Sequence, residues 1–254
     1  KTTASFFNWS KLTFWALFTH ILLDSLTSYG TGLFIPFSDY RIELNTIAIV
    51  DVFYTVPFLL SILIILFLRR DSHARYIIGR TGLFISTLYL VFTMINKQIS
   101  AYHFTLSLDE QNLSYNRLRV APLPLTNFLW MGIAETDDGY YRGYYSMFDD
   151  NDNIQFEKIH RNDEKIKSLK ANTRVENLLR FTKGYYQVQE LDEKTLAVHD
   201  LRFGTFGFGD ESQYIFSFEI KQLSDSLLIR QREMDSDLSK SDFQEYIARI
   251  KGED

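Results

Sequence analysis

A histidine and an aspartate stand four residues apart in an apolar stretch near the start of the chain, THILLDSLTSYGTGLFIPFSDYR (residues 19–41). Four residues make about one helical turn, so His20 and Asp24 share one face of a helix. An imidazole nitrogen and a carboxylate oxygen are both good ligands for zinc or a similar divalent ion. The spacing therefore suits a pair of metal ligands, or equally a hydrogen-bonded structural pair.

The residues around this pair predict a helix over residues 12–28 with an inverted pattern. One face carries Thr13, Leu17, His20, Asp24 and Thr27, and large apolar side chains cover the rest. Such a helix belongs in a membrane bundle, where ionisable groups face the interior. An uncompensated charge at membrane depth costs several kcal/mol, so Asp24 needs a partner, and a cation is one candidate.

Two further charged residues follow the pair. Asp51 lies about one turn inside an apolar segment, where an aspartate is costly and points to function. We expect Asp51 to be a catalytic residue or a further metal ligand; the alternatives are an interfacial aspartate or an ion pair with Arg41. The guanidinium of Arg41 is suited to clamping a phosphate through two hydrogen bonds, although an interfacial anchor is the alternative.

The apolar segments predict membrane spans. Residues 47–68 number about 22, which at about 1.5 Å per residue is enough to cross a hydrocarbon core of roughly 30 Å. Residues 77–95 predict a second span. The connector between them carries Arg69, Arg70 and Arg75, so the positive-inside rule places it in the cytoplasm and the chain after the second span on the other side.

Charge is divided unevenly along the 254 residues. Residues 1–100 hold eight Lys or Arg and five acidic residues, a net of +3, while the remainder holds 19 and 27, a net of −8. This division predicts a membrane-embedded helical region (1–100), a soluble domain (101–225) and a charged tail (226–254). The acidic half argues against nucleic acid as a partner. The absence of cysteine excludes disulfides and thiolate metal sites.

The soluble half shows strand patterns. Residues 129–149 predict two strands joined at Asp137-Asp138-Gly139, and residues 153–161 predict a short third strand. Residues 162–184 predict a helix with Gly184 at its end. Three later segments, YYQVQEL, TLAVHDLRF and QYIFSFEIK, complete an antiparallel sheet. The expected fold class is an α-helical membrane region followed by a small α+β soluble domain with an antiparallel sheet. The scattered histidines His103, His160 and His199 have no ligand spacing, and we expect them to be surface or structural residues.

The order of motifs in the first sixty residues resembles a known family. The motifs are His20-x-x-x-Asp24, Tyr29-Gly30-Thr31, Pro36-Phe37-Ser38 with Arg41, and Asp51-x-Phe53-Tyr54-Thr55-x-Pro57. Together they resemble the membrane-bound metal-dependent hydrolase family, also described as LexA-binding, inner-membrane-associated hydrolases. The blocks PLPLTNFLW, DDGYYRGYYS, LLRFTKGYY and DLRFG are similar to the soluble tail of many members, so the resemblance extends over nearly the whole chain.

The resemblance implies a multi-pass protein of the inner membrane, distantly like zinc-dependent phospholipase C. On that basis His20 and Asp24 map onto a metal-binding pair, and Asp51 and Arg41 match further motif positions. Members usually carry a His-rich motif upstream that this sequence lacks. The chain begins without Met, so we expect the upstream part of the bundle, with the remaining ligands, to precede it.

Three functions follow. The first is a membrane hydrolase in which His20, Asp24 and Asp51 hold a divalent metal, with zinc expected. The metal would activate a water and polarise the phosphoryl oxygen of a phosphoester, lipid phosphoesters included, with Arg41 on the phosphate. The second is a non-catalytic, membrane-anchored module whose acidic, tyrosine-rich soluble domain binds a protein or envelope partner. The third is transport, because intramembrane Asp and His also mark ion paths.

Overall fold

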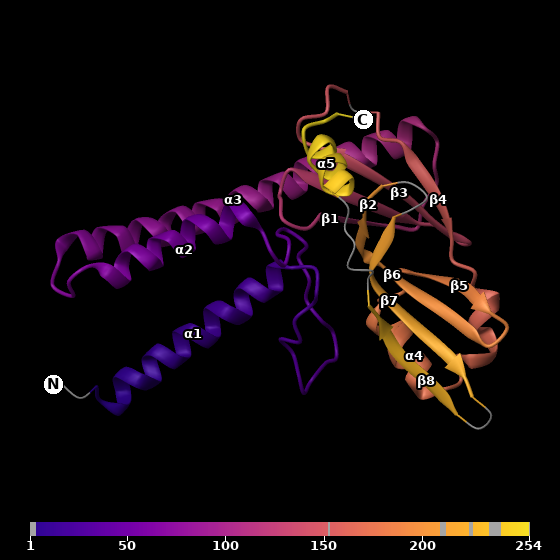
Figure 1. Cartoon of the computed structure of the whole chain (residues 1–254), viewed down its shortest axis with the longest axis horizontal. Helices are drawn as coiled ribbons and strands as arrows, with labels where there is room; N and C mark the ends of the chain where they lie inside the picture. Colours follow the sequence, from indigo (N-terminus) through magenta and orange to yellow (C-terminus); the bar gives the residue numbers. More distant parts are fainter. Residues whose placement is uncertain (1–3, 152, 209–211, 224–225, 234–239, 254) are drawn as a thin grey trace. The chain divides into compact units, whose positions relative to one another are not determined.

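The computed structural model describes residues 4–151, 153–208, 212–223, 226–233 and 240–253 (Figure 1). The chain forms two compact units. The first comprises residues 1–95 with 124–126, and the second comprises residues 96–123 with 127–254. The first unit is helical, and the second contains all the named strands.

Helix α1 (Phe6–Leu26) is the predicted first helix, extended toward the N-terminus. It starts before the predicted residue 12 because Ser5 caps it, its hydroxyl accepting a hydrogen bond from the amide of Asn8 at 3.3 Å. After α1 the chain makes an irregular loop closed by a bridge between Thr31 and Ile42. The amide of Thr46 then donates to the carbonyl of Leu26 at 2.8 Å, which holds the end of the loop against the end of α1.

Helix α2 (Val52–Phe67) is shorter than the span predicted over residues 47–68. Its 16 residues begin directly after Asp51, which caps the helix through its side chain. Residues 47 and 48 are buried in the loop that precedes the cap and are not helical. The apolar run therefore contains a turn as well as a helix, which hydropathy alone does not distinguish.

Helix α3 (His73–Glu110) is much longer than the second predicted span. Within the described residues it is the one helix both long and apolar enough to cross a membrane, and α2 is a shorter apolar helix. The expected pair of spans is thus reduced to one candidate. The second half of α3 leaves the apolar segment and enters the second unit at Asn96.

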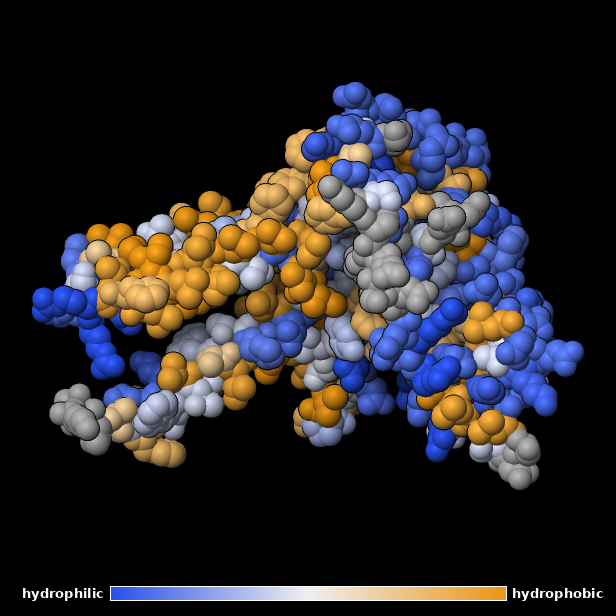
Figure 2. All heavy atoms as spheres, in the orientation of Figure 1, coloured by the Kyte–Doolittle hydropathy of each residue, from blue (hydrophilic) through white to orange (hydrophobic). Residues whose placement is uncertain are grey.

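The helices of the first unit carry large apolar side chains on the outside. On the part of α3 that belongs to this unit, the buried positions are Gly82, Ser86 and Thr93, whereas Leu83, Phe84 and Leu88 are exposed. None of the residues of α2 is buried. Figure 2 shows the resulting hydrophobic surface over α2 and the first part of α3. Helices with small residues at their contacts and apolar side chains outside are typical of membrane bundles.

Helices α2 and α3 pack closely as an antiparallel hairpin. A Cβ atom built at Gly82 would lie 2.5 Å from Oγ of Ser61, so only glycine permits this approach. At the turn of the hairpin, Nη1 of Arg75 donates to the carbonyl oxygens of Ile65 at 2.7 Å and Leu68 at 3.1 Å. Arg75 thereby satisfies carbonyls left open at the end of α2.

The second unit contains two four-stranded antiparallel sheets, where we expected one. The first follows the order β1 (Arg117–Pro122), β2 (Leu129–Glu135), β3 (Gly139–Ser146) and β4 (Phe156–His160). The second follows the order β5 (Tyr186–Asp192), β6 (Thr195–Phe206), β7 (Gln213–Gln222) and β8 (Leu227–Arg232). The hairpin predicted at Asp137-Asp138-Gly139 joins β2 to β3 and is confirmed.

The first sheet is buried on both faces, which explains why apolar and polar residues do not alternate clearly along β2. Trp130 faces a cluster that includes Phe104 of α3, and its neighbours Met131 and Ile133 face a second cluster with Leu201 of β6. Gly132 makes room for the ring of Phe104, because a Cβ there would lie 2.4 Å from that ring. The two clusters together form the core that holds the second unit together.

One face of the second sheet packs against two short helices. These are η1 (Asp163–Leu169) and α4 (Thr173–Phe181), whose Ile166, Val175 and Leu178 join Val188, Val198 and Ile220 of the sheet. The sequence predicted a single helix over residues 162–184. The break arises because Asn172 caps α4, its side chain accepting from the amide of Arg174 at 3.0 Å.

The expected charged tail (226–254) contains strand β8 and helix α5 (Lys240–Ile250) within its described residues, while residues 234–239 and 254 lie outside them. Tyr246 and Ile250 of α5 pack against the core cluster of the first sheet. Arg249 forms an ion pair with Asp149, with Nη1 to Oδ1 at 2.5 Å. Helix α5 is therefore part of the packed second unit.

Candidate functional site

His20 and Asp24 point toward each other on α1, as their spacing predicted. Nε2 of His20 lies 3.3 Å from Oδ2 of Asp24. Their side chains are 70 % and 50 % exposed, so the expectation that this face is turned inward is not met among the described residues. The reason is that no described element covers this part of α1, whose surrounding aromatic side chains are also exposed.

Asp24 and Asp51 line one pocket in the first unit. The pocket has a volume of about 380 Å³, and Tyr29, Thr31 and Tyr54 also contribute to its wall. His20 and Arg41 are not among the lining residues. The structure thus brings together two of the four residues singled out from the sequence, from the end of α1 and the start of α2.

The carboxylate of Asp51 is buried and hydrogen-bonded. Its Oδ1 accepts from the amide of Tyr54 at 3.1 Å, and both of its oxygens lie 3.0 Å from the hydroxyl of Tyr89 on α3. The side chain of Asp51 therefore caps α2 and ties it to α3. These contacts explain how a buried aspartate persists here. They leave lone pairs on the carboxylate for a further partner.

Arg41 stabilises the loop between α1 and α2. Its Nη1 donates to the carbonyl oxygen of Gly30 at 3.3 Å, next to the bridge between Thr31 and Ile42. The side chain is largely exposed. This contact gives Arg41 a structural role in the loop, and its predicted role on a phosphate stays a prediction.

The described residues contain no group of three or more His, Cys, Asp or Glu side chains arranged to hold a metal ion. His20 and Asp24 fit as two ligands. Two ligands at about 2.0–2.2 Å from a tetrahedral zinc lie roughly 3.3–3.6 Å apart. The 3.3 Å between Nε2 of His20 and Oδ2 of Asp24 is at the lower end of this range. The pair suits the ion in donor type and spacing, but zinc needs at least one more protein ligand.

Sequence comparison gives one match, to the helical region. Residues 2–100 match the family model described as YdjM inner membrane protein. The matched segment contains His20, Asp24, Arg41 and Asp51, and covers less than half of the chain. Comparisons with curated proteins and with solved structures give no match. The expected similarity to an inner-membrane family is supported for this segment. The likeness to zinc-dependent phospholipase C stays a prediction.

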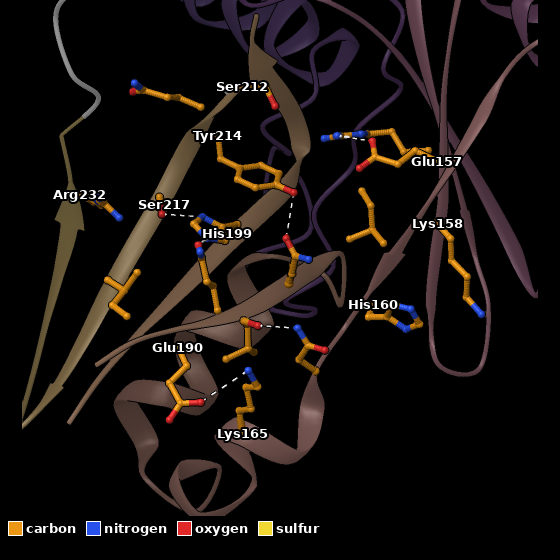
Figure 3. Close-up of a pocket in the computed structure, with 18 of the residues that line it drawn as sticks. Glu157, Lys158, His160, Lys165, Glu190, His199, Ser212, Tyr214, Ser217 and Arg232 are labelled. Atoms are coloured by element: carbon orange, nitrogen blue, oxygen red, sulfur yellow. Dashed lines mark hydrogen bonds and ion pairs between the residues drawn. The ribbon is translucent and has the colours of Figure 1, made fainter. Parts of the chain in front are cut away.

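Sequence reasoning missed a second, larger cavity. It lies in the second unit, has a volume of about 820 Å³, and is lined by β4 and by all four strands of the second sheet (Figure 3). His199, expected to be merely structural, is on its wall. The signal was present in the sequence as polar residues at alternate positions, such as Gln187 and Gln189. These positions could not be assigned to a cavity without knowing which strands are neighbours.

Proposed function

We propose that the protein is an integral inner-membrane hydrolase that uses a divalent metal, with zinc expected, on a phosphoester substrate. The observation that carries this proposal is the His20–Asp24 pair, in which two good zinc ligands are held 3.3 Å apart on one helical face. The match of residues 2–100 to an inner-membrane family and the apolar outside of the first unit support the location.

In this proposal His20 and Asp24 hold the metal and Asp51 is a further ligand or the base. A bound metal would polarise a phosphoryl oxygen and lower the pKa of a water molecule. Asp24 and Asp51 line the same pocket, so two carboxylates are available to it. Arg41 would bind the phosphate of the substrate. At least one further protein ligand is needed to complete the site.

We also propose that the protein crosses the membrane more than once and that the second unit is extracytoplasmic. Helix α3 is long enough to cross, and α2, which packs against it, is a shorter apolar helix. The connector between them carries Arg69, Arg70 and Arg75. Arginines in a short connector favour its retention in the cytoplasm. This arrangement puts the C-terminal end of α3 on the other side.

Elemental analysis of the purified full chain in detergent tests the proposal. We expect zinc to be retained by the wild type and lost from His20→Ala and Asp24→Ala. His73→Ala serves as a matched control, because it also removes one histidine but lies at the start of α3, outside the His20–Asp24 pair. Hydrolysis of bis(p-nitrophenyl) phosphate should fall together with the zinc content.

Zinc content that is unchanged in both His20→Ala and Asp24→Ala would refute the metal site. In that case the non-catalytic, membrane-anchored binding module becomes the better explanation of the chain. Loss of zinc without any loss of phosphodiester hydrolysis would instead separate the metal from the chemistry, and the ion would then have a structural role.

A further inference from the structure

The second sheet has one apolar face and one polar face. The apolar face packs against η1 and α4. On the other face, Gln187, His199, Ser217 and Arg232 stand opposite one another in register across β5, β6, β7 and β8. A row of polar side chains across a whole sheet is not needed for packing, because the opposite face already supplies the hydrophobic core.

This polar face forms a wall of the 820 Å³ cavity, and Glu157, Lys158 and His160 of β4 in the first sheet are also among the lining residues (Figure 3). The volume lies within the range of cavities that hold small molecules. It is much larger than the roughly 30 Å³ that one water molecule occupies in the liquid. The cavity is therefore large enough for a polar ligand with several functional groups.

The centre of the wall is held rigid by hydrogen bonds and stacking. Nδ1 of His199 lies 2.8 Å from Oγ of Ser217, and Nε2 lies 2.9 Å from Oε1 of Gln189. Because an amide oxygen only accepts, Nε2 carries the proton and Ser217 donates to Nδ1. The ring of Tyr214 stacks on the imidazole at 4.4 Å, and its hydroxyl donates to Gln187 at 3.0 Å. A preorganised wall of this kind reduces the entropy lost on binding.

Two arginines line the cavity, Arg232 from β8 of the second sheet and Arg142 from β3 of the first. The side chain of Arg232 makes no hydrogen bond or ion pair within the part of the chain that the structure describes, and its charge helps to lower the pKa of His199 after the larger effect of burial. Arg142 is only 6 % exposed, and its Nη2 contacts Glu157 at 2.7 Å. Its Nε and Nη1 are buried without a hydrogen-bond partner, and the rings of Tyr144 and Tyr214 flank the guanidinium.

Most of the acidic residues that line the cavity already form an ion pair with a basic side chain. Glu157 pairs with Arg142, and Glu190 faces Lys165 with 3.6 Å between Oε2 and Nζ. Glu233 is the lining acid that pairs with no described residue. Among the exposed cations, Lys158 is bound by Asp138 at 2.9 Å, so Arg232 is left as the accessible charge partner.

We propose that this cavity binds a small polar molecule through an anionic group, a carboxylate or a phosphate, that pairs with Arg232. The amide and hydroxyl groups of Gln187, Gln189 and Ser217 hydrogen-bond the rest of the ligand. The anion adds the charge partner that Arg232 lacks, and the uncharged part of the molecule fills the polar cavity. This site is independent of the metal site proposed for the first unit.

Three sugars of similar size test the proposal with the full chain in detergent: glucose, glucuronate and glucose 6-phosphate. Binding is measured by isothermal titration calorimetry at constant ionic strength. We expect saturable binding of at least one anionic sugar and at least tenfold weaker binding of glucose. Comparison of glucuronate with glucose 6-phosphate shows which anionic group the site prefers.

Arg232→Gln should weaken binding of the preferred anionic sugar at least tenfold. Arg230→Gln is the matched control, because Arg230 is on the same strand, loses the same charge and does not line the cavity. Equal weakening by the two substitutions would mean that only net charge matters and would overturn the proposal. So would saturable glucose binding as tight as that of the anions, or no saturable binding of any of the three sugars. Thermal unfolding of each variant shows that the fold is intact.

Discussion

The hydroxyl of Tyr89 lies 3.0 Å from both carboxylate oxygens of Asp51, across 38 positions of sequence. The same carboxylate accepts from the amide of Tyr54 and so caps α2. One side chain thus starts a helix and attaches it to its neighbour. A buried acid in an apolar segment, which on sequence grounds indicates function, here also has a clear structural role.

Loss of this contact should destabilise the α2–α3 hairpin. Tyr89→Phe removes one hydrogen bond to a charged acceptor, so we expect a loss of about 1–3 kcal/mol in unfolding free energy. Asp51→Ala removes the helix cap as well and should cost more. Unfolding followed by circular dichroism in detergent measures both. Tyr102→Phe, at an exposed tyrosine on the same helix, should have little effect.

Asp51→Asn separates structure from metal binding. The amide oxygen can still accept from Tyr54 or Tyr89, so the hairpin should retain much of its stability. If Asp51 is a metal ligand, zinc content should nevertheless fall in this variant. Full stability with full zinc content would restrict Asp51 to its structural role.

The close approach of α2 and α3 should make Gly82 intolerant of any side chain. In Gly82→Ala the new Cβ would lie 2.5 Å from Oγ and 2.9 Å from Cβ of Ser61, so the helices must separate. We expect a cost of about 1–3 kcal/mol. At Gly79 the nearest atom is Cδ1 of Ile65 at 3.4 Å, so Gly79→Ala should be tolerated. Adding Ser61→Gly to Gly82→Ala should restore the lost stability, because it removes the side chain that the new Cβ meets. A double variant as unstable as Gly82→Ala would argue against this packing.

His199 should make the second unit sensitive to acid. Burial, followed by the charge of Arg232, lowers the pKa of His199 from 6.5 to about 4 in the folded protein. Below pH 6.5 the unfolded state therefore takes up a proton that the folded state excludes. Above that pH His199 does not lower the free energy of unfolding. As the pH falls toward 4, the free energy of unfolding decreases, by at most about 3 kcal/mol.

Thermal unfolding between pH 7.5 and 4 measures this dependence. We expect His199→Gln to flatten it, because glutamine does not titrate. His160→Gln is the control, since the His160 side chain is 62 % exposed. An identical pH profile in the wild type and in His199→Gln would show that other groups cause the loss of stability.

The proposed membrane topology can be tested by cysteine labelling, because the native chain contains no cysteine. Asn151→Cys places an exposed thiol in the second unit, and Ala74→Cys places one beside the arginine-rich connector. With a membrane-impermeant maleimide on spheroplasts, we expect Asn151→Cys to react at once and Ala74→Cys to react only after lysis. The reverse order would invert the proposed orientation.

Local patterns were sufficient to predict many elements of this protein. The one-turn spacing of His20 and Asp24 put their side chains together, and the Asp137-Asp138-Gly139 turn marked the β2–β3 hairpin. The segments YYQVQEL, TLAVHDLRF and QYIFSFEIK correspond to β5, β6 and β7 of the second sheet, whereas β8 lies in the segment predicted as a charged tail. Each of these features depends on residues within a few positions of each other, where helical and strand periodicity apply directly.

Tertiary structure decided the rest. The split into two sheets, the partnership of Asp51 with Tyr89, and the cavity around His199 all depend on strands or helices far apart in the chain. No local periodicity encodes which strand pairs with which, because register is set by long-range burial of one face against another. The row from Gln187 to Arg232 becomes a surface only once four strands lie side by side.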